Sequence, residues 1–226
     1  MITYLFLAIF ICLMGYMVYF QTVKSEDFIN SPYNSRQDTF ADRVVRGKIM
    51  SADGKVLAET VVDAAGNETR KYPYGNMYAH VVGFSTNGKS GIESNMNFNL
   101  LRSHSFVLER MFNEIKDEKS MGDNVVTTLD STLQETAYQA LGNYDGAVVV
   151  MEPSTGKVLA MVSKPDFDPN TIAADWDSII SEDNNNSVLL NRATQGLYPP
   201  GSTFKIITTL ESVSYTHLRA HETPEH

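Results

Sequence analysis

The sequence predicts an α+β protein that begins with a membrane-spanning helix, and three observations support this prediction. Residues 2–20 form an apolar run without one charged side chain. Val45–Ala58 has the pattern of two short strands around a turn at Asp53-Gly54. Farther along, Ser131–Leu141 has helix signals and is followed by two apolar runs around a tight turn, which is typical of an antiparallel hairpin.

The apolar run at residues 2–20 is 19 residues long, which is just enough to cross a bilayer as a helix. A cleaved signal peptide has a shorter apolar core and a small-x-small cleavage site, and neither is seen. No basic residue precedes the run while Lys24 and Arg36 follow it, so the charge bias does not favour export, but that rule weakens for long translocated domains. We therefore expect an uncleaved anchor.

The net charge of the 226-residue chain is -9, which argues against nucleic acid or an anionic membrane surface as the main partner. Cys12 is the only cysteine, so no internal disulfide bond can form. These two features bound the class of protein without naming its function.

The middle and the second half of the chain give further local predictions. A helix is expected after Gly91, and Asp130 ends a strand-like run and is suited to cap the helix Ser131–Leu141. Gly146–Ser163 is expected to be the antiparallel hairpin. Residues 164–170 are expected to form a loop because of their prolines and acids, and Trp176 is expected in a surface loop.

A candidate nucleophile follows the helix-breaking pair Pro199-Pro200. Ser202 begins an apolar, helix-like run, and Lys205 lies three residues later on the same helical face. A serine hydroxyl needs a base within about 3 Å. A lysine that is desolvated near the positive end of a helix loses its proton more readily. We therefore expect Ser202 to be the nucleophile, Lys205 its base, and the helix after them to be buried through Phe204, Ile206, Ile207 and Leu210.

The S-x-x-K spacing alone is weak, because about one match is expected by chance in a chain of this length. Ser154 and Lys157 form a second match, in a P-S-T-G stretch that is typical of a turn. The residues around Ser202 are more specific. Q-G-L-Y-P-P-G-S-T-F-K closely resembles the active-site segment of the penicillin-binding proteins, the serine D,D-transpeptidases of peptidoglycan synthesis.

The resemblance extends along most of the chain. R-G-K-I-M-S-A-D-G-K-V-L-A, V-V-G-F and G-I-E resemble the N-terminal pedestal of class B penicillin-binding proteins, except that Ser51-Ala52 stands where the family usually has Asp-Arg. P-S-T-G, P-D-F-D-P-N and N-R-A-T before the serine follow the order of motifs in the transpeptidase domain. The resemblance implies an anchor at 1–20, a non-catalytic pedestal at 21–120 and the N-terminal part of a transpeptidase domain at 121–212.

This family resemblance also implies a reaction and partners. Ser202 would attack the carbonyl of the penultimate D-Ala of a stem pentapeptide, Lys205 would act as the base, and β-lactams would acylate the same serine. A polytopic glycosyltransferase would be a partner, no metal or cofactor is implied, and the folded part would lie outside the cytoplasmic membrane. A D,D-carboxypeptidase or β-lactamase with the same first motif would lack the long pedestal.

Residues 213–226 do not continue the helix pattern of the preceding run and resemble the translation of a sequencing adapter joined to a truncated gene. This tail holds His217, His221 and His226, which would suggest a metal site if the tail were native. We expect a non-native tail.

Two alternative functions stay open at this point. Gly83–Ser90 fits the phosphate-binding G-x-x-x-x-G-K-[ST] pattern at every position, which would make the protein a P-loop nucleotide binder. The anchor and pedestal alone would form a non-catalytic docking module of a cell-wall synthesis complex. Ser85-Thr86-Asn87 and Lys89-Ser90-Gly91 match the S-x-N and K-[TS]-G motifs of the family, but they lie upstream of Ser202, whereas the family has them downstream.

Overall fold

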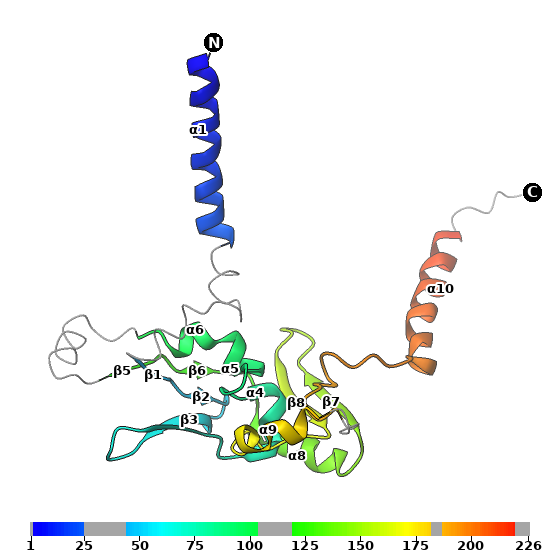
Figure 1. Cartoon of the computed structure of the whole chain (residues 1–226). Coiled ribbons are helices and arrows are strands. Elements are labelled where there is room, and N and C mark those ends of the chain that lie inside the picture. Colours follow the sequence, from blue (N-terminus) through cyan, green and yellow to red (C-terminus); the bar gives the residue numbers. More distant parts are fainter. Residues whose placement is uncertain (1, 25–43, 104–118, 182–186, 220–226) are drawn as a thin grey trace, which may run out of the picture. The chain divides into compact units, whose positions relative to one another are not determined.

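The computed structural model describes residues 2–24, 44–103, 119–181 and 187–219 (Figure 1). The chain divides into two compact units, Met1–Thr194 and Gln195–His226, and each is described by itself.

The predicted anchor is a helix. Helix α1 spans Ile2–Tyr19 and continues as a short π-helical turn, Phe20–Lys24. Together they form a 23-residue helix, in which an 18-residue window has a mean hydropathy of 2.1 and is not buried. By length and composition this helix can cross a membrane.

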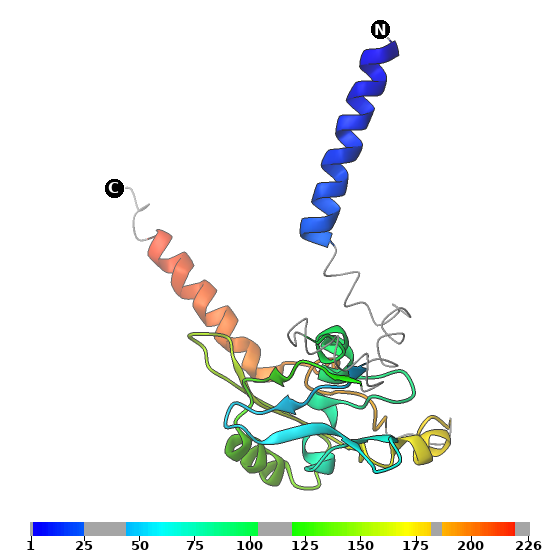
Figure 2. The same ribbon diagram turned by 90° about the vertical axis from the view of Figure 1, so that its left-hand side faces the viewer.

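The pedestal is built on a four-stranded sheet of order β4-β3-β2-β6, which both ribbon views show beside short helices (Figure 2). The strands are β2 (Ile49–Met50), β3 (Val56–Val62), β4 (Glu68–Lys71) and β6 (Val125–Val126). Strands β2 and β3 pair antiparallel, as the sequence predicts. Their turn is closed by a 2.9 Å bond from the Ser51 N–H to the Lys55 carbonyl, with Gly54 at a φ of 83°.

The strand order ties the beginning of the predicted transpeptidase part to the pedestal. β6 lies within residues 121–212, yet it pairs parallel with β2 at the edge of the pedestal sheet. A second parallel pair joins β1 (Val44–Val45) to β5 (Ser120–Met121). Between these pairs the backbones approach so closely that a Cβ atom on Gly47 would lie 1.9 Å from the Asp123 carbonyl oxygen, so only glycine fits there.

Short helices cover this sheet: η3 (Gly75–Tyr78), α4 (Ala79–Val82), α5 (Gly91–Asn95) and α6 (Asn97–Leu100). Helix α5 confirms the prediction of a helix after Gly91. The apolar core between sheet and helices consists of Ile49, Leu57, Ala58, Tyr72, Tyr78, Val82, Leu100 and Leu129. Strand β2 supplies Ile49 to this core, and β3 supplies the two consecutive residues Leu57 and Ala58.

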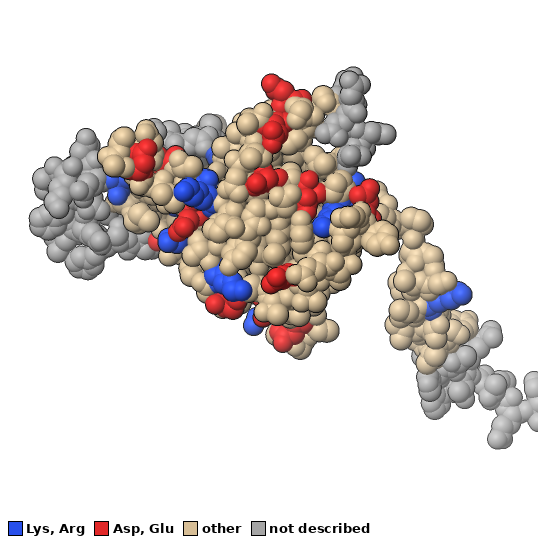
Figure 3. All heavy atoms as spheres, turned by 90° about the horizontal axis from the view of Figure 1, so that it is seen from below, with Lys and Arg blue, Asp and Glu red and all other residues tan. Residues whose placement is uncertain are grey.

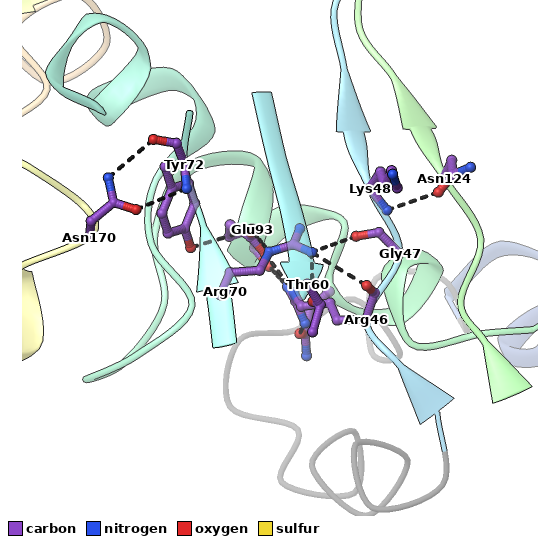
Figure 4. A network of polar contacts seen from close by, with 10 residues as sticks. Arg46, Gly47, Lys48, Thr60, Arg70, Tyr72, Glu93, Asn124 and Asn170 are labelled. Carbon is purple, nitrogen blue, oxygen red and sulfur yellow. Dashed lines mark hydrogen bonds and ion pairs between the residues drawn. The ribbon is translucent and has the colours of Figure 1, made fainter. Parts of the chain in front are cut away.

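A buried ion network joins α5 to the strands (Figure 4). The Glu93 carboxylate is fully buried and accepts from Arg46 Nε at 2.6 Å and from Arg70 Nε at 2.7 Å. Arg70 also donates to the Gly47 carbonyl at 2.7 Å and to the Thr60 hydroxyl at 3.0 Å. Burial is the main cause that lowers the pKa of Arg46, and the Glu93 charge opposes it. The sequence motif around Arg46 and Gly47 therefore serves this network.

The antiparallel hairpin and its helix confirm the predictions for the second half. Helix α8 (Ser131–Leu141) packs on strands β7 (Gly146–Met151) and β8 (Val158–Lys164) through Ala137, Ala160 and Val162. Asp130 caps the helix, because its side chain accepts from the Leu133 N–H at 2.9 Å.

The prediction of a surface loop around Trp176 is wrong. Residues 172–179 form helix α9 (Ile172–Ile179). Ile172 is buried with Phe84 and Phe167, and Trp176 and Ile179 pack against them. These three apolar residues of α9 are spaced at four and three residues, the helical period, whereas its acids are exposed. The acids and the short length hid this period in the sequence.

Polar contacts join the pedestal to the hairpin half, by which we mean the described residues of the first unit after Asp130. We call this set of contacts the seam. Its pedestal side is Tyr72–His80. The Asn170 amide makes two bonds to the Tyr72 backbone, at 2.9 and 3.1 Å. Asn76 donates to the Asp166 carboxylate at 2.9 Å. Gln134, fully buried on α8, donates to the Met77 carbonyl at 2.8 Å.

His80, which lies in α4, adds a further contact to the seam. Its Nε2 lies 3.0 Å from the Pro165 carbonyl oxygen, and its ring meets the Phe167 ring edge-on, 5.2 Å between centroids. Because a carbonyl oxygen only accepts, Nε2 carries the proton of a neutral ring. Burial is the main cause that lowers the pKa of His80, although the bond to Pro165 and the charge of Asp166 oppose it.

The second unit consists of a 3₁₀ turn, η4 (Gly201–Phe204), followed by helix α10 (Lys205–Arg219). The expectation that the helix pattern stops near Ser212 is therefore wrong. Residues 213–219 contain neither proline nor glycine, and Pro224 is the first residue that would end the helix. That residues 213–226 are a non-native tail stays a prediction.

The buried ion network can be tested by neutralising its carboxylate. Glu93→Gln should lower the free energy of unfolding by roughly 3–5 kcal/mol, because it leaves two buried guanidinium groups without a counter-charge. Glu59→Gln is the matched control, since its 2.9 Å pair with Lys48 is partly exposed and should contribute about 1 kcal/mol or less. Urea unfolding followed by circular dichroism measures both. Equal losses in the two variants would show that the network does not hold the pedestal.

His80 predicts a pH dependence of stability. As pH falls through about 6.5, the unfolded chain binds a proton at His80 before the folded chain does, because burial lowers the folded pKa. Stability should therefore be complete above this pH and decrease below it. His80→Gln should make the decrease between about pH 7 and about pH 5 shallower. Parallel stability profiles for the two proteins would contradict this role of His80.

Candidate active site

Ser202 and Lys205 lie at the beginning of the helix in the second unit. Ser202 belongs to the 3₁₀ turn η4, and Lys205 is the first residue of α10. The backbone N–H of Lys205 donates to the carbonyl oxygens of Ser202 and Thr203. A 3₁₀ turn has three residues per turn, so side chains three residues apart lie in line. Ser202 and Lys205 thus lie three residues apart where the turn passes into α10, a spacing that favours a common helical face.

The surroundings of this pair differ from the expectation. Ser202 and Lys205 are both exposed, so no described residue desolvates the lysine. The apolar residues that were expected to be buried are exposed by 49% to 68%: Phe204, Ile206, Ile207 and Leu210. In Figure 3 the visible face of α10 consists mostly of uncharged atoms. Within the second unit these apolar side chains are therefore left exposed.

A tight turn in the first unit precedes this segment. The Asn191 side chain accepts from the Ala193 N–H at 3.0 Å, and the Thr194 N–H donates to the Asn191 carbonyl at 3.1 Å. In the sequence, Asn191 was only part of the N-R-A-T motif, and neither its side-chain hydrogen bonds nor those of His80 were predicted. The signals were an asparagine at the start of a turn and a histidine within an apolar run.

The other S-x-x-K match is structural. Ser154 and Lys157 lie in the turn between β7 and β8, where the Gly156 N–H donates to the Glu152 carbonyl at 2.8 Å. Gly156 has a φ of 73°, as such a turn requires. This confirms the interpretation of the pair as a turn.

The P-loop alternative fails on its structural context. That motif needs a strand before its first glycine and a helix after its last residue, but Gly83 follows helix α4. Gly83 has a φ of 83°, and a Cβ atom on it would lie 2.0 Å from the Ser90 carbonyl oxygen. The Ser90 N–H donates to the Phe84 carbonyl at 3.0 Å. Gly83 thus closes a turn of the pedestal. The upstream S-x-N and K-[TS]-G matches belong to this turn and to the start of α5 directly after it.

No metal site emerges from the residues that the structure describes, among which no group of three His, Cys, Asp or Glu side chains could hold an ion. His217 lies in α10, while His221 and His226 fall outside the described residues.

Comparison with known proteins identifies both halves. Residues 146–221 match the penicillin binding protein transpeptidase domain. Residues 46–125 match the penicillin binding protein A dimerisation domain. The first match contains Ser202 and Lys205, and the second contains the buried ion network.

Individual relatives agree with these matches. The chain is 40% identical to the peptidoglycan D,D-transpeptidase PbpA of Mycolicibacterium smegmatis over 187 residues, 73% of this chain and 36% of the relative. The D,D-transpeptidase domain of a peptidoglycan glycosyltransferase from Eggerthella lenta is 39% identical with a TM-score of 0.62, covering 74% of this chain and 36% of that one.

A third comparison includes a bound β-lactam. The imipenem acyl-enzyme of penicillin-binding protein A from M. tuberculosis is 35% identical with a TM-score of 0.67, covering 78% of this chain and 43% of that one. The chain thus spans about a third of the length of the curated relatives. With a match to the family in each half of the folded region, the chain belongs to the penicillin-binding proteins.

Proposed function

We propose that the protein is a peptidoglycan D,D-transpeptidase in which Ser202 is the nucleophile and Lys205 its base. The observation that carries this proposal is the position of the two residues, three apart at the start of a helix, inside the region that matches the transpeptidase domain. Ser202 stands in the first turn, where backbone N–H groups have no acceptor inside the helix. Its own N–H is therefore suited to stabilise an oxyanion.

The reaction is an acyl transfer from a stem peptide. Ser202 Oγ bonds to the carbonyl carbon of the penultimate D-Ala, while its proton passes to Lys205. The bond to the terminal D-Ala breaks, and the leaving amine takes the proton from Lys205. The amine of a neighbouring peptidoglycan strand then attacks the ester carbonyl and gives a proton through Lys205 to Ser202 Oγ, which forms the cross-link and restores the Ser202 hydroxyl. A β-lactam would acylate Ser202 in the same way, as the acyl-enzyme of the M. tuberculosis relative supports.

Helix α1 supports a membrane location for this activity. Its length and hydropathy suit a single-pass anchor, with the folded part outside the cytoplasm where peptidoglycan lies. A membrane-embedded glycosyltransferase that supplies new strands would be the matching partner.

Catalysis is tested by labelled penicillin on an enzyme that carries its native downstream sequence. Ser202→Ala should abolish labelling, and Lys205→Ala should slow it by about 10²–10⁴ or more, because nucleophile and base act as one unit. The 226-residue chain alone should label far more slowly, since Lys205 is exposed in it.

The turn between β7 and β8 supplies matched controls for that experiment. Ser154→Ala and Lys157→Ala remove the same residue types at the same spacing, and labelling should be unchanged. Labelling that survives in Ser202→Ala would refute the assignment of the nucleophile.

Topology is tested with a reporter that is active only outside the cytoplasm. Fused after Ser212, it should be active, and the protein should keep its full length, because α1 serves as an uncleaved anchor. Deleting residues 2–24 should abolish reporter activity. A product shortened by about twenty residues would instead identify α1 as a cleaved signal sequence.

A further inference from the structure

The turn that leads toward Ser202 is tied to the pedestal by one side chain. Asn191 Nδ2 donates to the backbone carbonyl of His80 at 3.3 Å, while Asn191 Oδ1 accepts from the Ala193 N–H at 3.0 Å. A single amide thus donates to helix α4, makes a second Nδ2 contact with Met161 Sδ on β8 at 3.8 Å, and accepts within its own turn. Only asparagine offers both groups at this side-chain length.

A second contact holds the same turn from the other side. The Ser163 hydroxyl on β8 is buried, accepts from the Arg192 N–H at 2.9 Å and donates to the Leu190 carbonyl at 3.4 Å. Residues 190–193 are therefore fixed both to the hairpin, through Ser163, and to the pedestal, through Asn191.

The acceptor of Asn191 is itself held in place. His80 is 8% exposed, its ring donates to the Pro165 carbonyl, and the ring packs edge-on against Phe167. A shift of α4 relative to the loop after β8 would break these contacts. The His80 carbonyl is thus a hydrogen-bond acceptor held in place by the seam, and Asn191 of the turn donates to it.

We infer that Asn191 is a positioning residue for acyl transfer. It fixes to the pedestal the turn from which the backbone continues to Ser202. This inference rests on the proposed function. Thr194 is the last residue of the first unit, and the segment from there to Ser202 contains Pro199 and Pro200, whose φ angles are restricted. An error of about 1 Å at a reacting group can slow a reaction by about 10².

The test compares Asn191→Asp with wild type in the enzyme that carries its native downstream sequence. Aspartate has the same shape and keeps the acceptor for the Ala193 N–H, but it places an oxygen against the His80 carbonyl. The acylation rate constant at saturating labelled penicillin should fall by about 10-fold or more. The penicillin concentration for the half-maximal rate and the midpoint of thermal unfolding should stay near the wild-type values. Asn143→Asp, exposed in the turn after α8, is the matched control and should change neither.

Hydrogen exchange on the 226-residue chain gives a readout that does not depend on activity. Asn191→Asp should raise exchange in residues 190–194 and leave the protection of β7 and β8 unchanged. Asn191→Ser is a second variant in case the aspartate prevents folding, since its hydroxyl can accept from the Ala193 N–H but is too short to reach the His80 carbonyl.

Each outcome decides the inference. Slower acylation with raised exchange confined to residues 190–194 supports the positioning role. Unchanged acylation in a folded Asn191 variant overturns it, and so does loss of protection throughout β8, which would mark a general structural role. If the wild-type enzyme does not label at Ser202, the proposed function fails instead, and exchange alone decides whether Asn191 anchors the turn.

Discussion

A carboxylate without access to water organises the pedestal. Glu93 is fully buried, and two guanidinium groups that reach it from different parts of the sheet compensate its desolvation. Arg46 precedes β2, Arg70 lies in β4 and Glu93 lies in α5, so the three charges define how two strands and a helix meet. Apolar packing alone would tolerate other arrangements, because hydrophobic contacts have little directional preference. The ionic contacts have direction, and they select one arrangement.

The order imposed by Glu93 continues into the seam. The Tyr72 hydroxyl lies 3.4 Å from a Glu93 oxygen, and the Tyr72 backbone makes two hydrogen bonds with the Asn170 side chain. The pedestal segment from Tyr72 to His80 then contacts the chain after Asp130 through short polar bonds, beside apolar packing such as that of Ala79 with Phe167 and Ile172. Such bonds depend strongly on the donor–acceptor distance and angle, so they fix the relative position of the groups that they join. Each bond is individually weak, at about 0.5–1.5 kcal/mol.

Local signals in the sequence predicted the elements that local chemistry determines. The cap at Asp130, the turn at Asp53-Gly54 and the hairpin depend on neighbouring residues, and all three were predicted at their observed positions. The Glu93 network joins residues 23 and 47 positions apart, so no window of the sequence displays it. The amphipathic period of α9 was masked by its acids.

The candidate site divides in the same way. The position of Ser202 and Lys205 at the start of a helix follows from local sequence signals and was predictable. Their environment was not, because burial depends on elements distant in sequence, and the expected desolvation of Lys205 is absent from the described structure. The contacts of Asn191 likewise depend on His80, which lies 111 residues away.

The exposed apolar side chains of α10 have a practical consequence for handling the protein. Extracting α1 from a membrane requires detergent, and detergent tails bind any apolar helix face, whether or not it entered the bilayer. Phe204, Ile207 and Leu210 recur at three-residue intervals and expose at least 49% of their surface. A micelle would therefore collect around α10 as well as around α1. The mass of the solubilised particle then overstates the number of chains in it, unless bound detergent is measured separately.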